Sequence, residues 1–415
     1  MSGGRRRGPV VRRALGVLAV VVAIALVAAS LTAYLKYRAI WDSIGRIQVV
    51  GLGHRPPQLN AAMNVLVIGS DTRAGANRQF GAGITGQRSD TIMILHIASG
   101  GHNVVVLSIP RDSVVPVLAC PPEAGTTGQA AQPGQVEQVN ATFANGGPGC
   151  LWKTVEQTTR VRLDHFIEIN FTGFEKIIDD IGGVSICLPF AVHDSQSKLN
   201  LSAGRHHVRG AQALAFWRAR YIGEGSDLQR IRRDQYLMAS LLQGLKHSDL
   251  ASSPSQLIRV VTDAARYMTT DSGLSLPAMI GIATSLQGLH SSAVQFIELP
   301  TVPYAANPNW VSWPASDSRL FGEIARDQGV PAASRHRPAQ ARGGRGSLVT
   351  LPQPDGGNPG NLARQYGGIT GNANVCHDAG AFTGPRGGSL ASGRGRSSGV
   401  TGGPRRTYRA RLAAA

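Results

Sequence analysis

An uncharged, strongly apolar run near the N-terminus constrains this chain more than any other feature of its sequence. Residues 14–35 are 22 consecutive residues without a charged side chain. At about 1.5 Å per residue, a helix of that length reaches roughly 33 Å and crosses the hydrocarbon core of a bilayer. Five arginines precede it, at positions 5, 6, 7, 12 and 13. Because basic residues favour the cytoplasmic side, we expect a single-pass membrane protein with its N-terminus in the cytoplasm and the rest of the chain extracellular.

A cleaved signal peptide is the alternative interpretation of the same run. Residues 23–25, Ala-Ile-Ala, could serve as a cleavage site. The apolar run continues well past them, however, and is longer than the usual apolar core of a signal peptide, about 7–15 residues. We therefore favour an uncleaved anchor in the cell membrane.

The formal net charge of +17 suggests a nucleic-acid-binding protein, but the charge lies at the two ends of the chain. Residues 331–415 hold twelve arginines and two acids, whereas residues 14–330 hold 25 basic and 23 acidic residues. A nearly neutral middle argues against nucleic acid as a partner. Residues 331–415 also hold 18 glycines and 7 prolines, which predicts a disordered tail. The expected order is a basic N-terminus (1–13), a transmembrane helix (14–35), a juxtamembrane stalk (36–62), one extracytoplasmic domain (63–330) and the tail (331–415).

Between the stalk and the tail, short β-rich apolar runs alternate with helical patterns. The residues between 114 and 149 read as a loop-rich insertion. The strand runs are continuously apolar, which is typical of strands covered on both faces. The predicted fold class is therefore α/β, with a single central mixed β-sheet, helices on both of its faces and one preceding transmembrane helix. Strands are expected at 64–69, 91–97, 103–109, 165–170, 184–188 and 293–299, and helices at 151–159, 174–181, 210–217, 227–246, 254–267 and 276–286.

Four cysteines fit an oxidising location outside the cytoplasm. Cys120 and Cys150 bracket the loop-rich insertion and are the preferred disulfide pair. A bridge between Cys187 and Cys376 is possible as well. Four cysteines allow three connectivities, and the sequence alone does not choose among them.

Acids accompanied by arginines stand at the ends of three predicted strands. Asp71 follows the first strand, Arg88-Ser89-Asp90 precedes the second and Arg111-Asp112 follows the third. Each acid alone is an ordinary turn former or helix cap. Their repetition at the strand ends of an α/β sheet, where ligands bind, favours a hard divalent cation bridged to phosphate.

Five arginines are concentrated between residues 213 and 235. Arg218 and Arg220 alternate with apolar residues, which in an extended segment would send both guanidinium groups to the same side. In the helix that follows, one face is expected to carry Asp227, Arg230, Arg233 and Asp234, while Arg232 faces solvent. Converging arginines favour phosphate, whose oxygens they bind bidentately. The alternative is a solvated face with local ion pairs.

The chain resembles the LytR-CpsA-Psr family of cell-wall assembly enzymes in five segments, which occur in the order GSDTR, RSDT, SIPRD, GGV and RARYIGEGSDLQRIRRDQ. Its insertion and basic tail are similar to those of the actinobacterial members of the family. The resemblance covers roughly residues 63–246 closely. It implies a phosphotransferase that moves a glycopolymer from a polyprenyl-pyrophosphate carrier onto a hydroxyl of peptidoglycan. The partners it implies are that lipid-linked glycopolymer, peptidoglycan and membrane lipid, with the lipid tail in an apolar tunnel between sheet and helices.

The resemblance also assigns roles to individual residues. Asp71 and Asp90 would hold Mg²⁺ or Mn²⁺ against the pyrophosphate. Apart from the resemblance, the positions of the acids suggest that either Asp90 or Asp112 could take the proton of the acceptor hydroxyl. Asp227 is expected to orient Arg218 or Arg220 and not to act as a base, because an acid among arginines has a lowered pKa. The residues expected to act in catalysis are Asp90, Arg111, Arg218 and Arg220, and those expected to bind substrate are Arg88, Arg111, Asp112, Arg218, Arg220, Asp227, Arg230 and Arg233.

One residue departs from the family pattern. The family commonly has glutamine where this chain has Asp234, and a carboxylate cannot donate a hydrogen bond to phosphate. The loss of that donor leaves open a polyprenyl-phosphate-binding protein without turnover. A second alternative, suggested by older names of the family, is a membrane-tethered transcription regulator.

Overall fold

The computed structural model describes residues 9–72, 77, 88–116, 118–120, 135–219, 222, 227–247, 253–328, 362–366 and 368–373 of the 415. At its centre lies an eight-stranded mixed sheet in the order β1-β12-β7-β2-β3-β4-β13-β16. The pairs β1–β12, β2–β7 and β4–β13 are parallel and the other four are antiparallel. The strands are β1 (Gly45–Ile47), β2 (Met63–Ser70), β3 (Ser89–Ile97), β4 (Val104–Ile109), β7 (His165–Asn170), β12 (Met268–Asp271), β13 (Val294–Glu298) and β16 (Ile369–Thr370).

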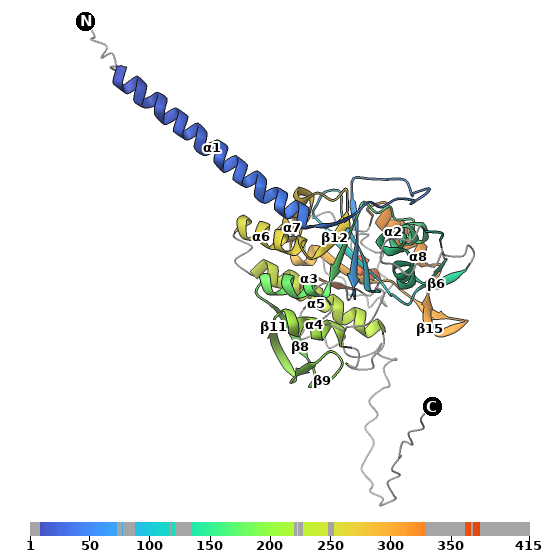
Figure 1. Ribbon diagram of the computed structural model, residues 1–415. Coiled ribbons are helices and arrows are strands. Elements are labelled where there is room, and N and C mark those ends of the chain that lie inside the picture. Colours follow the sequence, from blue (N-terminus) through green and yellow to red (C-terminus); the bar gives the residue numbers. More distant parts are fainter. Residues whose placement is uncertain are drawn as a thin grey trace, which may run out of the picture.

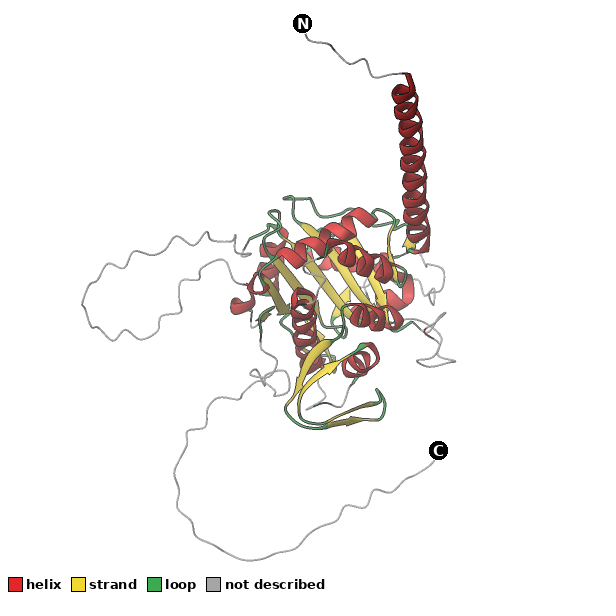
Figure 2. Ribbon diagram, turned by 90° about the vertical axis from the view of Figure 1, so that its left-hand side faces the viewer, coloured by secondary structure: helices red, strands yellow, loops and turns green. Residues whose placement is uncertain are grey.

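Helices cover both faces of this sheet, which confirms the predicted fold class (Figures 1 and 2). One face carries α2 (Val139–Thr159), α8 (Asp317–Ala325) and the short α9 (Leu362–Gln365). The other carries α3 (Phe171–Asp180), α5 (Asp227–His247), α6 (Pro254–Ala265) and α7 (Leu276–Gly288), with α4 (Gly210–Arg218) beside α3.

Alternate residues of the central strands enter two different cores. In β2, Leu66 and Ile68 pack under α2 and α8, whereas Val65 and Val67 pack under α5 and α7. Successive side chains of a strand point to opposite faces, so a strand buried on both faces must be apolar at every position. This is the physical reason for the continuous apolar runs.

The described residues also form four two-stranded ribbons outside the central sheet. The predicted strand 184–188 is formed, but it belongs to one of these ribbons and not to the central sheet. The ribbons pair β5 (Val114–Pro116) with β6 (Val136–Gln138), β8 (Val184–Leu188) with β11 (Gly204–Val208), β9 (Val192–Asp194) with β10 (Leu199–Leu201), and β14 (Val302–Tyr304) with β15 (Asn307–Ser312).

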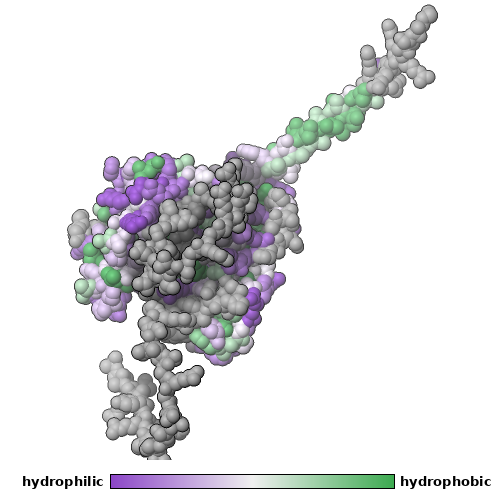
Figure 3. Space-filling view, turned by 180° about the vertical axis from the view of Figure 1, so that it is seen from behind, coloured by the Kyte–Doolittle hydropathy of each residue, from purple (hydrophilic) through white to green (hydrophobic). Residues whose placement is uncertain are grey.

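The N-terminal helix α1 (Pro9–Ser43) extends beyond the predicted segment and leads directly into the sheet. Ile40, Trp41 and Ile44 pack into the core formed by α6 and α7, and the Arg46 guanidinium lies 4.1 Å from the centroid of the Trp41 ring. β1 begins at Gly45, immediately after Ile44. A separate stalk over residues 36–62 is therefore a wrong prediction, because the patterns of short edge strands are too weak to read. Figure 3 shows the exposed apolar surface of α1 projecting from the domain.

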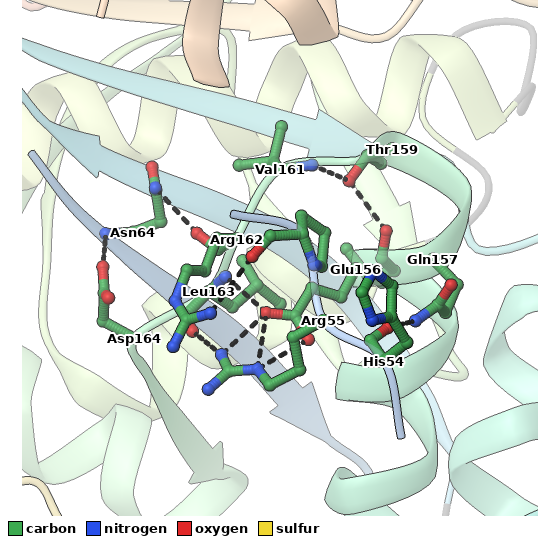
Figure 4. Close-up of polar contacts among 12 residues, drawn as sticks. His54, Arg55, Asn64, Glu156, Gln157, Thr159, Val161, Arg162, Leu163 and Asp164 are labelled. Atoms are coloured by element: carbon green, nitrogen blue, oxygen red, sulfur yellow. Dashed lines mark hydrogen bonds and ion pairs between the residues drawn. The ribbon is translucent and has the colours of Figure 1, made fainter. Parts of the chain in front are cut away.

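The rest of the expected stalk is also bound to the domain, by an ion pair between the half-buried Arg55 and the buried Glu156 (Figure 4). Arg55 Nη2 donates to Glu156 Oε1 at 2.7 Å, and Arg55 Nε donates to both carboxylate oxygens at 3.0–3.1 Å. Glu156 lies in α2 and is fully buried, and it also accepts the backbone N–H of Leu163. One arginine therefore joins the segment before β2 to the end of α2 and the start of β7.

Two further corrections concern the insertion and the tail. The region expected to be loop-rich contains the β5–β6 ribbon and the first half of α2, which Gly146 and Gly147 interrupt with non-helical backbone angles. Residues 362–373 of the expected disordered tail include α9 and β16, and β16 pairs with β13. Cys120 and Cys150 form the predicted disulfide, with Cα atoms 5.5 Å apart. Cys187 is also disulfide-bonded, and Cys376 lies outside the described residues.

Candidate functional site

The antiparallel pairing of β2 and β3 brings the first two acid-containing motifs together. Ser70 lies opposite Ser89, so Asp71 and Asp90 stand at one end of adjacent strands. The backbone N–H of Arg88 donates to Asp71 Oδ1 at 2.7 Å, and the Asp71 N–H donates to the Arg88 carbonyl at 3.0 Å. These bonds fix the direction of the Asp71 carboxylate. The Arg88 side chain itself is exposed.

Asp90 connects the strand-end motifs to helix α5. Arg111, which follows β4, donates from Nη1 to Asp90 Oδ1 at 2.5 Å. Arg230, in the first turn of α5, places Nη2 3.8 Å from Asp90 Oδ2. Arg230 is buried, and its Nε has no hydrogen-bond partner in the described part of the chain. A buried guanidinium with an unused donor beside a polar cavity is suited to receive an anion.

These residues surround a polar cavity of 240 Å³. Its lining includes two acids, Asp71 and Asp90, and two arginines, Arg218 and Arg230. The cavity is completed by Phe171, Gln196 and Ser197. Arg111 and Asp234 lie just behind it, in a small gap that also involves Asp90 and Arg230.

Arg218 reaches this cavity from the last turn of a helix, so the extended alternation expected for Arg218 and Arg220 is wrong for Arg218. α4 continues through Arg218, and the chain becomes extended only at Ala219. The apolar residues Phe216 and Trp217 are needed in the helical core, which explains the misleading pattern. The Arg218 guanidinium lies 4.9 Å from the centroid of the Phe171 ring, a cation–π contact that orients it. Arg220 lies outside the described residues.

Other predicted residues support the site or lie away from it. Arg233 is buried and donates from Nη2 to the Ala219 carbonyl at 2.9 Å, so it holds the segment that follows Arg218. Burial lowers the pKa of Arg233, Asp234 opposes that shift and Arg230 adds to it. Asp112 accepts from Gln138 at 2.7 Å and lies 3.6 Å from Arg111, and it does not line the cavity. The side chain of Asp227 lies outside the described residues.

The acids at the strand ends are the candidate ligands for a metal. Among the described residues, no group of three or more His, Cys, Asp or Glu side chains could hold a metal ion. Asp71 and Asp90 nevertheless line one polar cavity together. Mg²⁺ usually takes one or two carboxylates and completes its coordination with water and phosphate oxygens. The two acids therefore fit a magnesium ion that is bound jointly with a phosphorylated ligand.

A second cavity, of 320 Å³, lies between the sheet and the helices of the face that carries α3, α5, α6 and α7, and its lining is apolar. The sheet contributes Leu95, Ile167 and Phe296 to its wall, while α3, α5 and α7 contribute further aliphatic side chains. It matches the apolar space expected between sheet and helices. The end of α1 packs into the same core, through Ile40, Trp41 and Ile44.

Sequence reasoning missed three residues of the polar cavity. Phe171 begins α3, and Gln196 and Ser197 belong to the turn between β9 and β10. Neither stretch has a charge pattern or a motif that marks it. The two are brought to the site only by the packing of α3, α4 and the β9–β10 ribbon.

Comparison with known proteins places this architecture in a family. The model of the LytR_cpsA_psr family matches residues 42–320. The chain is 31% identical over 300 residues to the probable cell wall biosynthesis protein LcpB of Corynebacterium glutamicum, covering 69% of this chain and 66% of LcpB. It is 26% identical over 210 residues to the polyisoprenyl-teichoic acid–peptidoglycan teichoic acid transferase TagU of Bacillus cereus, covering 50% of this chain and 61% of TagU. The matches thus span less than two thirds of the length of these relatives.

A solved structure shares the fold. The LytR-Csp2A-Psr enzyme from Actinomyces oris superposes with a TM-score of 0.53 at 22% identity, and the match covers 68% of this chain and 96% of that one. At this identity the likeness concerns the fold alone.

Proposed function

This chain belongs to the LytR-CpsA-Psr family, and from that premise we propose that it transfers a glycopolymer, with one phosphate, from a polyprenyl-pyrophosphate carrier to a hydroxyl of peptidoglycan. Distant relatives are named as transferases of polyisoprenyl-linked teichoic acid to peptidoglycan, which supports this class of reaction. The proposal does not extend to teichoic acid as the glycopolymer that this chain transfers.

The observation that carries the proposal is that two helices, α3 and α5, each contribute side chains to two unlike cavities. The polar cavity sets two carboxylates against Arg218 and Arg230, and the apolar cavity lies beneath the same face of the sheet. A polyprenyl pyrophosphate has the same two parts, a charged head and a long hydrocarbon tail. We assign the head to the polar cavity and the tail to the apolar one.

In the proposed reaction, the acceptor hydroxyl oxygen attacks the phosphorus that bears the sugar. A new P–O bond forms, the bond to the bridging oxygen breaks, and polyprenyl phosphate leaves with the bonding electrons. Phosphoryl transfer depends mainly on charge neutralisation and in-line positioning. Arg218 and Arg230 neutralise phosphate oxygens, and Arg111 holds Asp90 in place. The proton of the acceptor hydroxyl passes to a carboxylate. Of the two candidates, Asp90 lines the cavity, whereas Asp112 is engaged by Gln138.

Asp71 and Asp90 would hold Mg²⁺, or Mn²⁺ in its place. When bound, the ion supplies positive charge to the pyrophosphate oxygens. The hydrogen bond from the Arg88 backbone to Asp71 and the ion pair from Arg111 to Asp90 orient the two carboxylates before an ion arrives.

We further propose that α1 anchors the protein in the cell membrane, with the enzyme domain outside. Residues Arg13–Ser43 are long and apolar enough to cross a bilayer. Since the end of α1 packs into the core beside the apolar cavity, a lipid that leaves the bilayer has a short path to that cavity.

The direct test is a transfer assay with the full chain in detergent, a polyprenyl-pyrophosphate-linked glycan, peptidoglycan fragments and Mg²⁺. The expected products are glycan bound to peptidoglycan through a phosphodiester and free polyprenyl phosphate in equal amounts. Binding of the donor without either product would favour a binding protein without turnover. A reporter fused after Pro331 that is active only in the cytoplasm would favour a transcription regulator.

The role of the apolar cavity has its own test. Ala283 lines that cavity from α7, so Ala283→Trp should fill it and weaken binding of long-chain donors more than of donors with a five-carbon tail. Thr284 is exposed on the same helix, and Thr284→Trp is the matched control. If Ala283→Trp and the Thr284→Trp control prefer long-chain over short-chain donors to the same extent, the assignment of the lipid tail to this cavity is refuted.

A further inference from the structure

A short C-terminal segment wraps around one edge of the central sheet and has no role in the reaction described so far. We call it the strap, and it consists of residues 362–366 and 368–373. Leu362 and Ala363 of its helix α9 pack in the core under α2 and α8, whereas Ile369 packs in the cores on the opposite face. Between these contacts, β16 pairs with β13 as the last strand of the sheet. The strap therefore reaches both faces of the sheet at its β13 edge.

The strap lies directly behind one wall of the apolar cavity. Ile369 is opposite Phe296 in the strand register, and the Gly371 N–H donates to the Val294 carbonyl at 2.8 Å. Gly371 also lies against Leu242 of α5, so closely that an added methyl group would be 2.6 Å from Leu242 Cδ2. Phe296, Val294 and Leu242 all line the apolar cavity. Within the described part of the chain, no other strand pairs with β13 on this side, so the strap covers that wall of the cavity.

Two glycines make this close fit possible. A methyl group added at Gly368 would overlap the Phe296 carbonyl oxygen, and one added at Gly371 would lie 2.6 Å from the Ser291 carbonyl oxygen. Backbone approaches this close admit only glycine, which has no Cβ. The strap is therefore fitted to the edge of the sheet and to α5, and a side chain at either glycine would push it away.

The strap also fixes helix α5. Gln243 Nε2 donates to the carbonyl of Gly371 at 2.8 Å and to that of Ala373 at 3.1 Å. A second link between α5 and β13 lies nearer the start of the helix, where Arg232, expected to face solvent, is partly exposed and places Nε 3.7 Å from Glu298 Oε2. About three turns of helix separate the two links. The strap thus holds α5 beside the apolar cavity, and the ion pair holds it beside the phosphate site.

We propose that the strap is a clamp on the apolar cavity, which holds α5 against β13 and thereby determines how tightly a long hydrocarbon tail is bound. The inference rests on the proposed function for the identity of the lipid. With the strap docked, Leu242 and Phe296 are backed from behind and present a continuous wall. With the strap released, α5 moves more freely at the level of the cavity, and the tail loses contacts on that side. The pyrophosphate is not affected, because the start of α5 keeps its own link to β13.

Long-chain lipids depend on this clamp more than short-chain ones. A long tail fills the apolar cavity, and its binding grows with the apolar area removed from water. A five-carbon tail offers little such area and is held mainly through its pyrophosphate. The strap lies outside residues 42–320, which match the family model, so the clamp belongs to the C-terminal part of this particular chain.

The test measures lipid binding to the full chain in detergent, without turnover. The probes are decaprenyl pyrophosphate and dimethylallyl pyrophosphate, which share a head and differ in tail length. The combined change Gly368→Ala, Gly371→Ala forces the strap away from β13, because both methyl groups meet backbone oxygens. Gln243→Leu removes two hydrogen bonds to the strap without adding bulk to it. The control is Gly281→Ala, on the exposed side of α7, whose methyl group meets no atom of the described chain within 4 Å.

We expect the double glycine variant to bind decaprenyl pyrophosphate about tenfold more weakly, mainly through faster dissociation, and to keep its affinity for dimethylallyl pyrophosphate within about twofold. Gln243→Leu should show the same selectivity with a smaller loss, of about threefold. In both variants, amide hydrogen exchange of residues 368–373 should be faster than in Gly281→Ala, which ties the loss of affinity to release of the strap.

Faster exchange of the strap with unchanged affinity for decaprenyl pyrophosphate would overturn the proposal. An equal loss of affinity for both pyrophosphates would overturn it as well, because it would indicate general damage to the domain. Transfer activity is a separate measurement. A chain whose long-chain binding depends on the strap but which transfers nothing would contradict the proposed function and leave the clamp standing.

Discussion

At the scale of single residues, each charge of the candidate site is oriented by a neighbour of a different kind. Arg218 stacks on Phe171, and Asp71 is fixed by a backbone N–H. Arg111 pairs with Asp90, which also faces Arg230. Side chains that are held before the ligand arrives need little reorganisation when charge develops.

Arg218→Ala should lower the transfer rate by about 10²–10³-fold, the usual cost of removing one donor to a developing charge. The Arg218 side chain is only half-buried, so the thermal midpoint of the variant should stay close to that of the wild type. Rates are measured by release of polyprenyl phosphate, with Arg205→Ala, an exposed arginine of β11, as control. A large loss of stability with little loss of rate would identify a structural ion-pair cluster instead.

A second residue prediction concerns acid stability far from the site. His96 Nε2 lies 3.0 Å from Asp327 Oδ1, and the Ser99 N–H donates to Oδ2 at 3.0 Å. Burial raises the pKa of Asp327, but the hydrogen bonds from His96 and Ser99 outweigh it and bring the pKa to about 2, below the ordinary 3.8.

Since the pKa is lowered on folding, the carboxylate contributes stability that is complete above about pH 4 and is lost as the pH falls toward about 2. Asp327→Asn should therefore be less stable than the wild type at neutral pH. It should also lose less stability than the wild type as the pH falls from about 4 to about 2. Asparagine tolerates the left-handed backbone at this position, where φ is 57°. Parallel curves of thermal midpoint against pH for the two proteins would refute this account.

At the scale of elements, much of the sheet could be predicted and its edges could not. The strands that were predicted closely, β2, β3, β4 and β7, lie at the centre, where burial on both faces demands apolar residues throughout. The edge strands β1 and β16 have three and two residues, too few for any periodicity. The first half of α2 was missed because Gly146, Gly147 and Pro148 resemble a loop.

The candidate site divides in the same way. Asp71 and Asp90 could be predicted from the sequence because each stands at the end of an apolar run that itself predicts a strand. Phe171, Gln196 and Ser197 come from elements that only tertiary packing brings together. Arg218 was found for the wrong local reason, since its alternation with Phe216 and Trp217 reflects the core-facing side of a helix.

The Arg55–Glu156 pair makes a prediction at the scale of elements. Arg55→Ala leaves a fully buried carboxylate without its partner and should cost about 3–5 kcal/mol of unfolding free energy. The double variant Arg55→Met, Glu156→Leu removes both charges and should recover most of that loss. Denaturant unfolding of the three proteins measures the difference, and a double variant as unstable as Arg55→Ala would show that the loss comes from packing and not from the unpaired charge.

At the scale of the whole molecule, the chain is anchored at both ends of its sheet. The helix α1 enters at one edge through β1, and β16 closes the opposite edge beside β13. The family match ends at residue 320, so the segment that includes β16 lies outside it. Gln243 of α5 donates to the carbonyls of Gly371 and Ala373, which ties that segment to a helix that carries site residues.

The proposed anchor predicts the mass of the mature protein. If α1 stays uncleaved, intact-mass spectrometry of the protein extracted from membranes should give a chain that retains residues 14–43, and alkaline carbonate should not release it. A mature chain that begins within or just after residues 23–25 would identify a signal peptide. Replacing residues 14–35 with a known cleavable signal is the control for secretion without an anchor.

The direct connection between α1 and β1 limits the distance between the domain and the bilayer surface. With Ile44 in the core and β1 starting at the next residue, almost no slack separates the anchor from the sheet. In the proposed topology the domain moves freely along the plane of the membrane but hardly at all away from it. Lipid carriers share that plane and arrive by two-dimensional diffusion. The wall polymer is stationary, so the proposed transfer would reach only its innermost layer, and the height of the domain would determine which part of the wall is modified.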